Sequence, residues 1–279
     1  MFTEIADKRG RKLRLYYEVR GPSSAPPLLL IRGLARHLLH WGKLTELLES
    51  DFRLVLFDNR GMGRSDVPRP PYTTRIMADD AARVLQDAGV ERAHVFGMSL
   101  GGMIAQEFAL RHPARVERLV LGCTRAGPGT GPRIAPRVVL QMLGAGRFSP
   151  DEAIKRTAHM ALGPAFIQRH PEVVESWQAL AREYPPTRAG FLGQLLAGGL
   201  HDTRKRLDRI VHPTLVVTGD ADDLIHADHS RYLARRIRGA QLEVLPGAAH
   251  DFTTERPELA ARVLRDFLLA HPTSVATAV

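Results

Sequence analysis

Short, continuous apolar runs alternate with longer segments of helical spacing along most of this chain. The run Leu28–Ile31 is apolar at every position, which is typical of a strand buried on both faces of a parallel sheet. Residues 74–88 instead place apolar side chains at helical intervals and are followed by Gly89, a common residue after a helix. Because strands that alternate with helices need crossover connections, the pattern predicts an α/β fold with a mostly parallel sheet.

The same criteria locate the other elements of the predicted sheet and its helices. Strands are predicted at 2–5, 12–19, 28–31, 53–57, 93–96, 118–122, 214–218 and 241–245. Helices are predicted at 41–49, 74–88, 102–110, 230–238 and 258–270. This alternation predicts a doubly wound sheet with helices on both faces.

The pattern changes between Gly127 and Pro132, a segment rich in glycine and proline. From there to about residue 206 helical spacing continues without a convincing strand, and helices are predicted at about 133–143, 150–162, 164–170, 172–183 and 187–199. We therefore divide the chain into an α/β core, residues 1–126 and 207–279, and an inserted helical cap, residues 127–206.

One short motif stands where a predicted strand ends and a predicted helix begins. Gly97-Met98-Ser99-Leu100-Gly101 has the form Gly-x-Ser-x-Gly. At a sharp strand-to-helix turn, the glycines remove side chains that would collide, and the serine lies at the tip with its Oγ exposed. Ser99 is therefore a candidate nucleophile.

A serine hydroxyl is a weak nucleophile unless a neighbouring base takes its proton. Two downstream loops, each directly after a predicted strand, supply an acid and a histidine. The first is Gly219-Asp220-Ala221-Asp222-Asp223, and the second is Pro246-Gly247-Ala248-Ala249-His250. Because the carboxyl ends of parallel strands share one edge of a sheet, both loops can meet Ser99 there. The sequence thus predicts a catalytic triad of Ser99, an aspartate and His250.

These motifs resemble those of the α/β-hydrolase fold family, and in particular its small capped bacterial serine esterases and lactonases. The resemblance covers nearly the whole core and rests on Asp58–Asp66, Gly97–Met103, Gly219–Asp222 and Pro246–His250. It implies an α/β-hydrolase core with a cap, and it assigns the acid to Asp222. Asp223 remains as the alternative acid.

The predicted oxyanion hole is formed by two backbone N–H groups. Leu100 follows the nucleophile and supplies one candidate donor. By resemblance, the other is Leu34, in the loop after the strand at 28–31. Gly33 keeps this loop tight, but Arg32 stands where the family usually has histidine.

The departure at Arg32 allows two hypotheses. In the first, the guanidinium pairs with a nearby loop carboxylate, such as Asp58 or Asp66. In the second, Arg32 lines the pocket and binds an anionic or carbonyl-rich substrate.

The predicted cap carries large apolar side chains that can form the ceiling of a hydrophobic pocket. We expect substrate contacts from the two regions that would border the nucleophile, the elbow with its oxyanion loop and the cap. The candidates are Gly33, Arg32, Met98, Phe148 and Trp177.

Composition narrows the partners. The net charge is +9, but the basic residues are scattered, so we predict no nucleic-acid partner. The single cysteine, Cys123, excludes an internal disulfide and a cysteine-based metal cluster, and we expect neither metal nor organic cofactor. No apolar run approaches the roughly 20 residues needed to cross a bilayer, and the N-terminus lacks a signal-peptide pattern. We expect a cytoplasmic monomer or homodimer.

The sequence therefore predicts a serine hydrolase that cleaves carboxylic esters or lactones of a hydrophobic small molecule through an acyl-enzyme. A C–C bond hydrolase, a cofactor-free perhydrolase or haloperoxidase, and an acyltransferase would use the same triad. A non-catalytic small-molecule receptor on the same fold is the alternative outside the enzymes.

Overall fold

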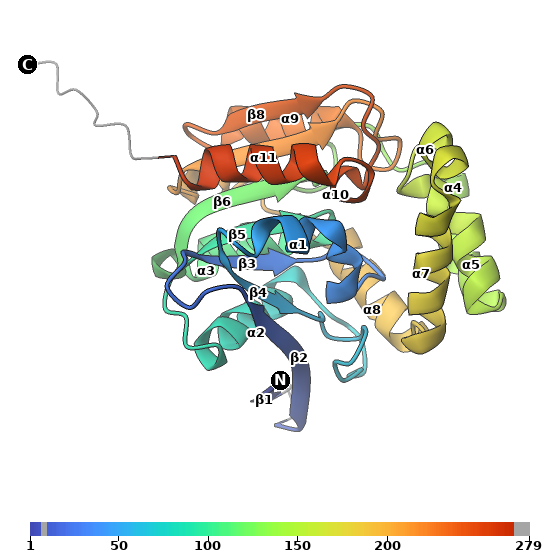
Figure 1. The fold of residues 1–279 in the computed structure, drawn as a ribbon, viewed down its shortest axis with the longest axis horizontal. Helices are drawn as coiled ribbons and strands as arrows, with labels where there is room; N and C mark the ends of the chain where they lie inside the picture. Colours follow the sequence, from blue (N-terminus) through green and yellow to red (C-terminus); the bar gives the residue numbers. More distant parts are fainter. Residues whose placement is uncertain (7–9, 271–279) are drawn as a thin grey trace, which may run out of the picture.

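The computed structural model describes residues 1–6 and 10–270, and in these residues eight strands form one sheet in the order β1-β2-β4-β3-β5-β6-β7-β8 (Figure 1). The strands are β1 Phe2–Ala6, β2 Lys12–Arg20, β3 Pro27–Ile31, β4 Arg53–Phe57, β5 Ala93–Met98, β6 Val116–Gly122, β7 Thr214–Gly219 and β8 Gln241–Leu245. β1 pairs with β2 and β2 with β4 in antiparallel fashion, and all the other neighbours are parallel. The predicted fold class is confirmed.

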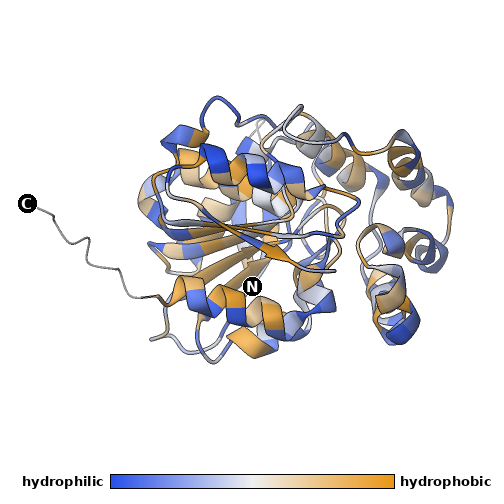
Figure 2. Ribbon diagram, turned by 90° about the horizontal axis from the view of Figure 1, so that it is seen from above, coloured by the Kyte–Doolittle hydropathy of each residue, from blue (hydrophilic) through white to orange (hydrophobic). Residues whose placement is uncertain are grey.

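Alternate side chains of β3 show why this strand is apolar throughout. Leu28 and Leu30 join the apolar cluster on one face of the sheet, whereas Leu29 and Ile31 join the cluster on the other. All four are fully buried. Figure 2 shows the consequence, with hydrophobic strands lying between two layers of helices.

The two faces of the sheet are covered by different helices. Leu44 of α1 (Lys43–Leu48) and Leu264 of α11 (Pro257–Leu268) pack in one cluster, together with Phe252 at the start of the short helix α10 (Phe252–Glu255). The opposite cluster takes side chains from α2 (Thr74–Asp87), α3 (Leu100–Arg111) and α9 (Ala227–Arg236).

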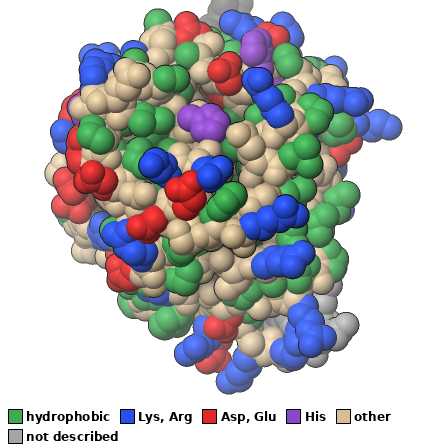
Figure 3. Space-filling view, turned by 90° about the vertical axis from the view of Figure 1, so that its right-hand side faces the viewer, with side chains coloured by type: hydrophobic (Ala, Val, Ile, Leu, Met, Phe, Trp, Pro, Cys, Tyr) green, Lys and Arg blue, Asp and Glu red, His purple; other side chains and the backbone are tan. Residues whose placement is uncertain are grey.

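The cap is helical, and α4–α7 stand apart from the sheet beside its carboxyl edge (Figure 1). Its helices are α4 Pro136–Gly144, α5 Pro150–Thr157, α6 Pro164–Arg169, α7 Pro171–Glu183 and α8 Arg188–Gly199. Ala158, Leu162 and Trp177 form a small apolar cluster of their own within it. Seen from the cap side, basic side chains are spread over the surface rather than gathered in one patch (Figure 3).

The observed elements differ from the predicted ones mainly at their ends. The helix predicted at 41–49 is α1, which begins at Lys43, whereas Trp41 is the last residue of a preceding 3-10 helix, Leu38–Trp41. Gly42 lies between them at φ 49° and ψ −132°, a conformation that interrupts helical hydrogen bonding. Of the residues assigned to the core, 7–9 and 271–279 lie outside the described part of the chain. Within the described part, no helix is both long and apolar enough to span a bilayer.

Candidate active site

Ser99 occupies a sharp turn between β5 and α3. Its backbone lies at φ 58° and ψ −120°, in the left-handed region that non-glycine residues rarely adopt. The two flanking glycines permit this turn, because a Cβ at Gly97 would lie 2.2 Å from the carbonyl oxygen of Gly101 and one at Gly101 would lie 1.9 Å from that of Ile31. Ser99 itself is partly exposed, so the turn presents its side chain to incoming molecules.

His250 and Asp222 meet beside this turn, from the loops after β8 and β7. The Nδ1 of His250 lies 2.8 Å from Oδ2 of Asp222. The other oxygen, Oδ1, accepts the backbone N–H groups of Leu224 at 2.9 Å and Ile225 at 2.8 Å, which fixes the carboxylate. Because a carboxylate only accepts, Nδ1 carries the hydrogen and Nε2 is left as the basic nitrogen.

The environment of His250 favours its protonated form. Burial opposes the positive imidazole, but the charge of Asp222 and its hydrogen bond outweigh this, and the pKa of His250 is raised from its ordinary value. Asp251 raises this pKa further, whereas Arg32 lowers it.

The structure separates the candidate acids. Asp222 is buried against the histidine, whereas Asp223 is exposed and Asp220 accepts the backbone N–H of Gly247. Of the three, Asp222 is the one that contacts His250. This geometry agrees with the assignment that the resemblance implied.

Cys123 links the pair to the nucleophile turn. The Ser99 N–H donates to the carbonyl oxygen of Gly122 at 2.8 Å, and the next residue places its Sγ within 4.8 Å of ligand atoms of Asp222 and His250. A metal would need the thiolate, but burial, with Asp222 adding to it, raises the pKa of the Cys123 thiol well above its ordinary value. The His250 nitrogen facing Asp222 is also already engaged in the hydrogen bond, so this donor set fits a triad better than a metal site.

The loop after β3 approaches the nucleophile at Gly33. A Cβ added there would lie 3.0 Å from Cβ and 3.5 Å from Oγ of Ser99. The N–H groups of Leu34 and Leu100, the predicted oxyanion donors, have no acceptor among the described residues. Leu100 is the first residue of α3, where N–H groups lack an acceptor within the helix.

Arg32 pairs with a loop carboxylate, as the first hypothesis holds, but the partner is Asp251, and the named candidates Asp58 and Asp66 are wrong. Its Nη2 donates to Oδ2 of Asp251 at 2.6 Å and to the carbonyl oxygen of His40 at 2.7 Å. Asp58 instead accepts the N–H groups of Leu38 and Arg64. The Arg32 side chain is therefore buried and points toward the segment that follows His250.

The other predicted substrate contacts are placed differently from one another. Met98 is buried, with its Sδ 3.2 Å from Nη1 of Arg32. Phe148 is 43% exposed on the cap, where the Arg156 guanidinium lies over its ring. Trp177 is buried on α7 and faces the loop after β3, where the guanidinium of Arg36 lies 3.8 Å from its ring centroid.

Arg36 and Gln194 were missed by the sequence analysis. Gln194 of α8 accepts the N–H of Ala35 at 3.1 Å and donates to the carbonyl oxygen of Arg60 at 3.0 Å. It therefore holds the cap against the loop that carries Leu34. A glutamine in a helix of low polarity is a weak signal of such contacts. Arg36 could have been noticed because it lies only two residues after Leu34.

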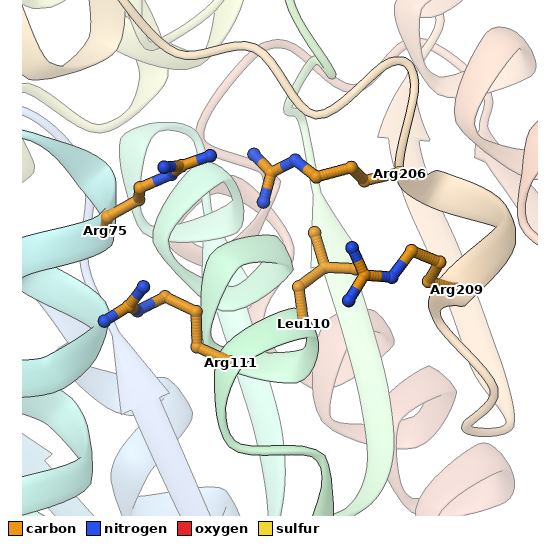
Figure 4. A pocket seen from close by; sticks show the side chains of 5 residues that line it. All are labelled: Arg75, Leu110, Arg111, Arg206 and Arg209. Atoms are coloured by element: carbon orange, nitrogen blue, oxygen red, sulfur yellow. The ribbon is translucent and has the colours of Figure 1, made fainter.

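A pocket lies away from Ser99, between α2, α3 and the segment 206–209. Four arginines and one leucine line it: Arg75, Leu110, Arg111, Arg206 and Arg209 (Figure 4). Arg206 donates to Glu107 and Arg111 to Asp79, so acidic neighbours already offset part of this charge.

Comparisons with known proteins agree with this geometry. The family model described as "alpha/beta hydrolase fold" matches residues 26–257. The chain is 34% identical to a poly(3-hydroxyalkanoate) depolymerase from Ectopseudomonas oleovorans over 248 residues, covering 89% of this chain and 86% of the relative. It is 31% identical to a putative carbamate hydrolase, RutD, from Azorhizobium caulinodans, covering 91% and 94%.

A solved structure provides the same comparison in three dimensions. The enol-lactonase from Burkholderia xenovorans superposes with a TM-score of 0.84 at 26% identity, covering 96% of this chain and all of that one, 100%. The family model spans more than half of the chain, and the sheet, elbow and acid–histidine pair lie where the sequence motifs predicted. The chain belongs to the α/β-hydrolase fold family.

Proposed function

We propose that this protein is a serine hydrolase that cleaves carboxylic esters or lactones of hydrophobic small molecules through an acyl-enzyme. The observation that carries the proposal is the 2.8 Å contact between His250 and Asp222 at the sheet edge where Ser99 stands on its strained turn. Because Nδ1 is engaged with Asp222, Nε2 is the ring nitrogen that is left to act as a base.

The reaction divides into two transfers. Ser99 Oγ attacks the carbonyl carbon while His250 Nε2 takes the hydroxyl proton, and the resulting oxyanion accepts hydrogen bonds from the N–H groups of Leu34 and Leu100. Collapse expels the alcohol oxygen, which receives the proton from His250. A water molecule then attacks the acyl group, gives its proton to Nε2, and the acid leaves as Ser99 regains its hydrogen. Asp222 orients the imidazole and stabilises its charged form throughout.

Relatives support ester or lactone cleavage as the reaction class. One is named as the depolymerase of a polyester and one solved structure as an enol-lactonase, whereas the RutD relative is named for carbamates. These names all describe hydrolysis at a carbonyl carbon. A cytoplasmic location and a monomeric or dimeric state remain predictions from the sequence.

A fluorophosphonate serine probe, followed by a panel of esters, lactones and β-diketones, tests the proposal. We expect the wild type and Ser176→Ala, a control at an exposed serine of α7, to be labelled and to hydrolyse esters or lactones. Ser99→Ala should show neither property. Labelling that persists in Ser99→Ala would refute the assigned nucleophile, and labelling without turnover of any panel member would favour a receptor. Turnover of β-diketones alone would point to C–C bond cleavage.

A further inference from the structure

The charges beside the loop that follows β3 do not balance. Arg32 and Arg36 bring two positive charges to this region, and Asp251 is the carboxylate whose charge acts on Arg36. His37 and His40 add no charge at neutral pH, because burial lowers the pKa of His37 to about 3 and that of His40 well below its ordinary value. These five described residues, two arginines, one aspartate and two neutral histidines, therefore carry one net positive charge.

Arg32 already occupies the Asp251 carboxylate. Its Nη2 bonds Oδ2 at 2.6 Å, and Oδ1 accepts the Thr253 hydroxyl at 2.6 Å and lies 3.4 Å from Nη1 of Arg32. The backbone N–H of Thr254 adds a fourth donor. Little acceptor capacity remains for a second guanidinium.

Arg36 is the cation left over. Its guanidinium has no hydrogen-bond acceptor and no ion pair among residues 1–6 and 10–270, although the side chain is half-buried. It lies 3.8 Å from the centroid of the Trp177 ring, so the aromatic face positions the group while its N–H edge stays available. Burial lowers the pKa of Arg36 to about 10, so the group remains charged at neutral pH.

The loop places the backbone of Arg36 close to Ser99. The N–H of Arg36 donates to the carbonyl oxygen of Gly33 at 3.3 Å, which closes a turn, and turns of this kind keep the two Cα atoms within about 7 Å. Gly33 lies directly against Ser99, as the 3.5 Å approach of a Cβ at this position to Oγ shows. Trp177 reaches Arg36 from the cap, so the guanidinium stands where core and cap meet, on a residue two positions after Leu34.

We propose that Arg36 is a specificity-determining residue that binds a carboxylate of the substrate, so that the preferred substrates are esters or lactones carrying a second, free carboxylate group. The inference rests on the proposed function and names its substrate class. A carboxylate fits better than a phosphate because one free guanidinium offers a two-pronged donor edge and one unbalanced charge, which a monoanion satisfies.

Matched substrates test the proposal. The anionic substrate is the 4-nitrophenyl monoester of glutaric acid, and its neutral counterpart is the same compound with the free carboxyl masked as a methyl ester. We expect the wild type to prefer the anionic ester. In Arg36→Gln, KM for the anionic ester should rise and its kcat/KM relative to the neutral ester should fall about tenfold to a hundredfold, since hydrogen bonds to charged groups have that effect. Arg36→Lys should recover part of the preference.

Two controls separate this effect from general electrostatics and from loss of structure. Arg238→Gln removes the same charge from an exposed position just before β8, at the opposite edge of the sheet, and should retain the preference. Inhibition by free glutarate gives a readout independent of turnover, and its inhibition constant should rise in Arg36→Gln. Melting temperatures show whether each variant folds.

The outcomes distinguish the two proposals. Ser99-dependent hydrolysis with an equal change for both esters in Arg36→Gln would overturn the role of Arg36, because loss of the Trp177 contact alone would act on both substrates. The same holds if the wild type prefers the neutral ester. Absence of Ser99-dependent hydrolysis of either ester would overturn the proposed function and this inference with it.

Discussion

Arg32 donates to Asp251 across 2.6 Å, and the two side chains are only 2% and 5% exposed. The residue in the position usually held by histidine in this family is thus a buried cation with its own counter-ion. The pair also includes the residue next to His250, so it couples the loop after β3 to the loop that carries this histidine.

Removing one member of this pair should destabilise the fold. In Arg32→Met the Asp251 carboxylate stays buried without its main donor, and loss of one partner of a buried pair costs about 3–5 kcal/mol. Denaturant unfolding of Arg32→Met, Asp251→Asn and the double variant measures the free energy of unfolding as a cycle. If the loss of stability in the double variant equals the sum of the two single losses, the two residues do not interact energetically.

The same substitution should shift the pH dependence of catalysis. Arg32 lowers the pKa of His250 and Asp251 raises it, so Arg32→Met leaves the raising effect uncompensated. The base is active when unprotonated, and the acid limb of kcat/KM should therefore move to higher pH. Asp251→Asn should move it to lower pH. Limbs that stay in place in both variants would contradict this coupling.

Asp222→Asn should lower kcat by about 10⁴-fold, because an amide cannot hold the imidazole in the tautomer that leaves Nε2 basic. Asp223→Asn is the matched control on the next residue, which is exposed, and it should retain activity. Steady-state turnover of an ester hydrolysed by the wild type decides between them. Equal losses in both variants would argue against the acid identified by the geometry.

Gly33→Ala should impair catalysis more than folding. The new Cβ would lie 3.0 Å from Cβ of Ser99 and 3.2 Å from the carbonyl oxygen of Met98, so the loop must shift away from the nucleophile. We expect kcat/KM to fall about tenfold to a hundredfold, as small misplacements in a site can cause. Gly144→Ala in α4, where a Cβ meets open space, should leave turnover unchanged. Wild-type activity in Gly33→Ala would show that the loop tolerates this displacement.

Buried histidines should make the fold sensitive to acid. Burial lowers the pKa of His37 and His201 to about 3 and that of His94 to about 4. The unfolded chain binds these protons near pH 6.5 and the folded chain does not, so stability falls as the pH drops below about 6.5. Each such histidine contributes about 1.4 kcal/mol per pH unit in this window.

His94→Gln provides the measurement. Between pH 7 and pH 5 the free energy of unfolding should fall in both proteins, and the fall should be about 1–2 kcal/mol smaller in His94→Gln than in the wild type. His159→Gln, at an exposed position, should follow the wild type. Parallel curves for His94→Gln and the wild type would mean that His94 does not contribute to acid sensitivity.

Local pattern predicted the sheet well because its parallel strands are buried on both faces. Leu28–Ile31 cannot be read as an exposed segment, and the observed strand β3 differs by one residue. Pattern failed where one backbone angle decides, as at Gly42, which makes the helix predicted from Trp41 begin at Lys43. Helical spacing alone carries no information about such a turn.

One could anticipate that Ser99, Asp222 and His250 lie at the same edge of the sheet because each follows a strand directly, whereas their surroundings could not be anticipated. Choosing between Asp222 and Asp223 from geometry requires the contact with His250, and only the folded loop, through the N–H groups of Leu224 and Ile225, orients Asp222 for it. The partner of Arg32 lies 219 residues further along the chain. Contacts of that kind depend on tertiary packing and leave no periodic signal.

The cap meets the backbone of the core at two places, along α8 and between α5 and α6. A Cβ at Gly190 would lie 2.0 Å from the carbonyl oxygen of Gly61, and one at Gly193 would lie 2.4 Å from the ring of Tyr72, so α8 rests on the core with no room for larger side chains. The part of the cap that carries α4–α7 touches the core between α5 and α6, where the N–H of Asp251 donates to the carbonyl oxygen of Ala161 at 2.7 Å and the N–H of Gly163 donates to Glu255 at 2.6 Å. An engineer who wishes to change which molecules reach Ser99 can therefore vary the side chains of α4–α7, but has to keep both the α8 contact and the backbone bond at Ala161, which holds the residue next to His250.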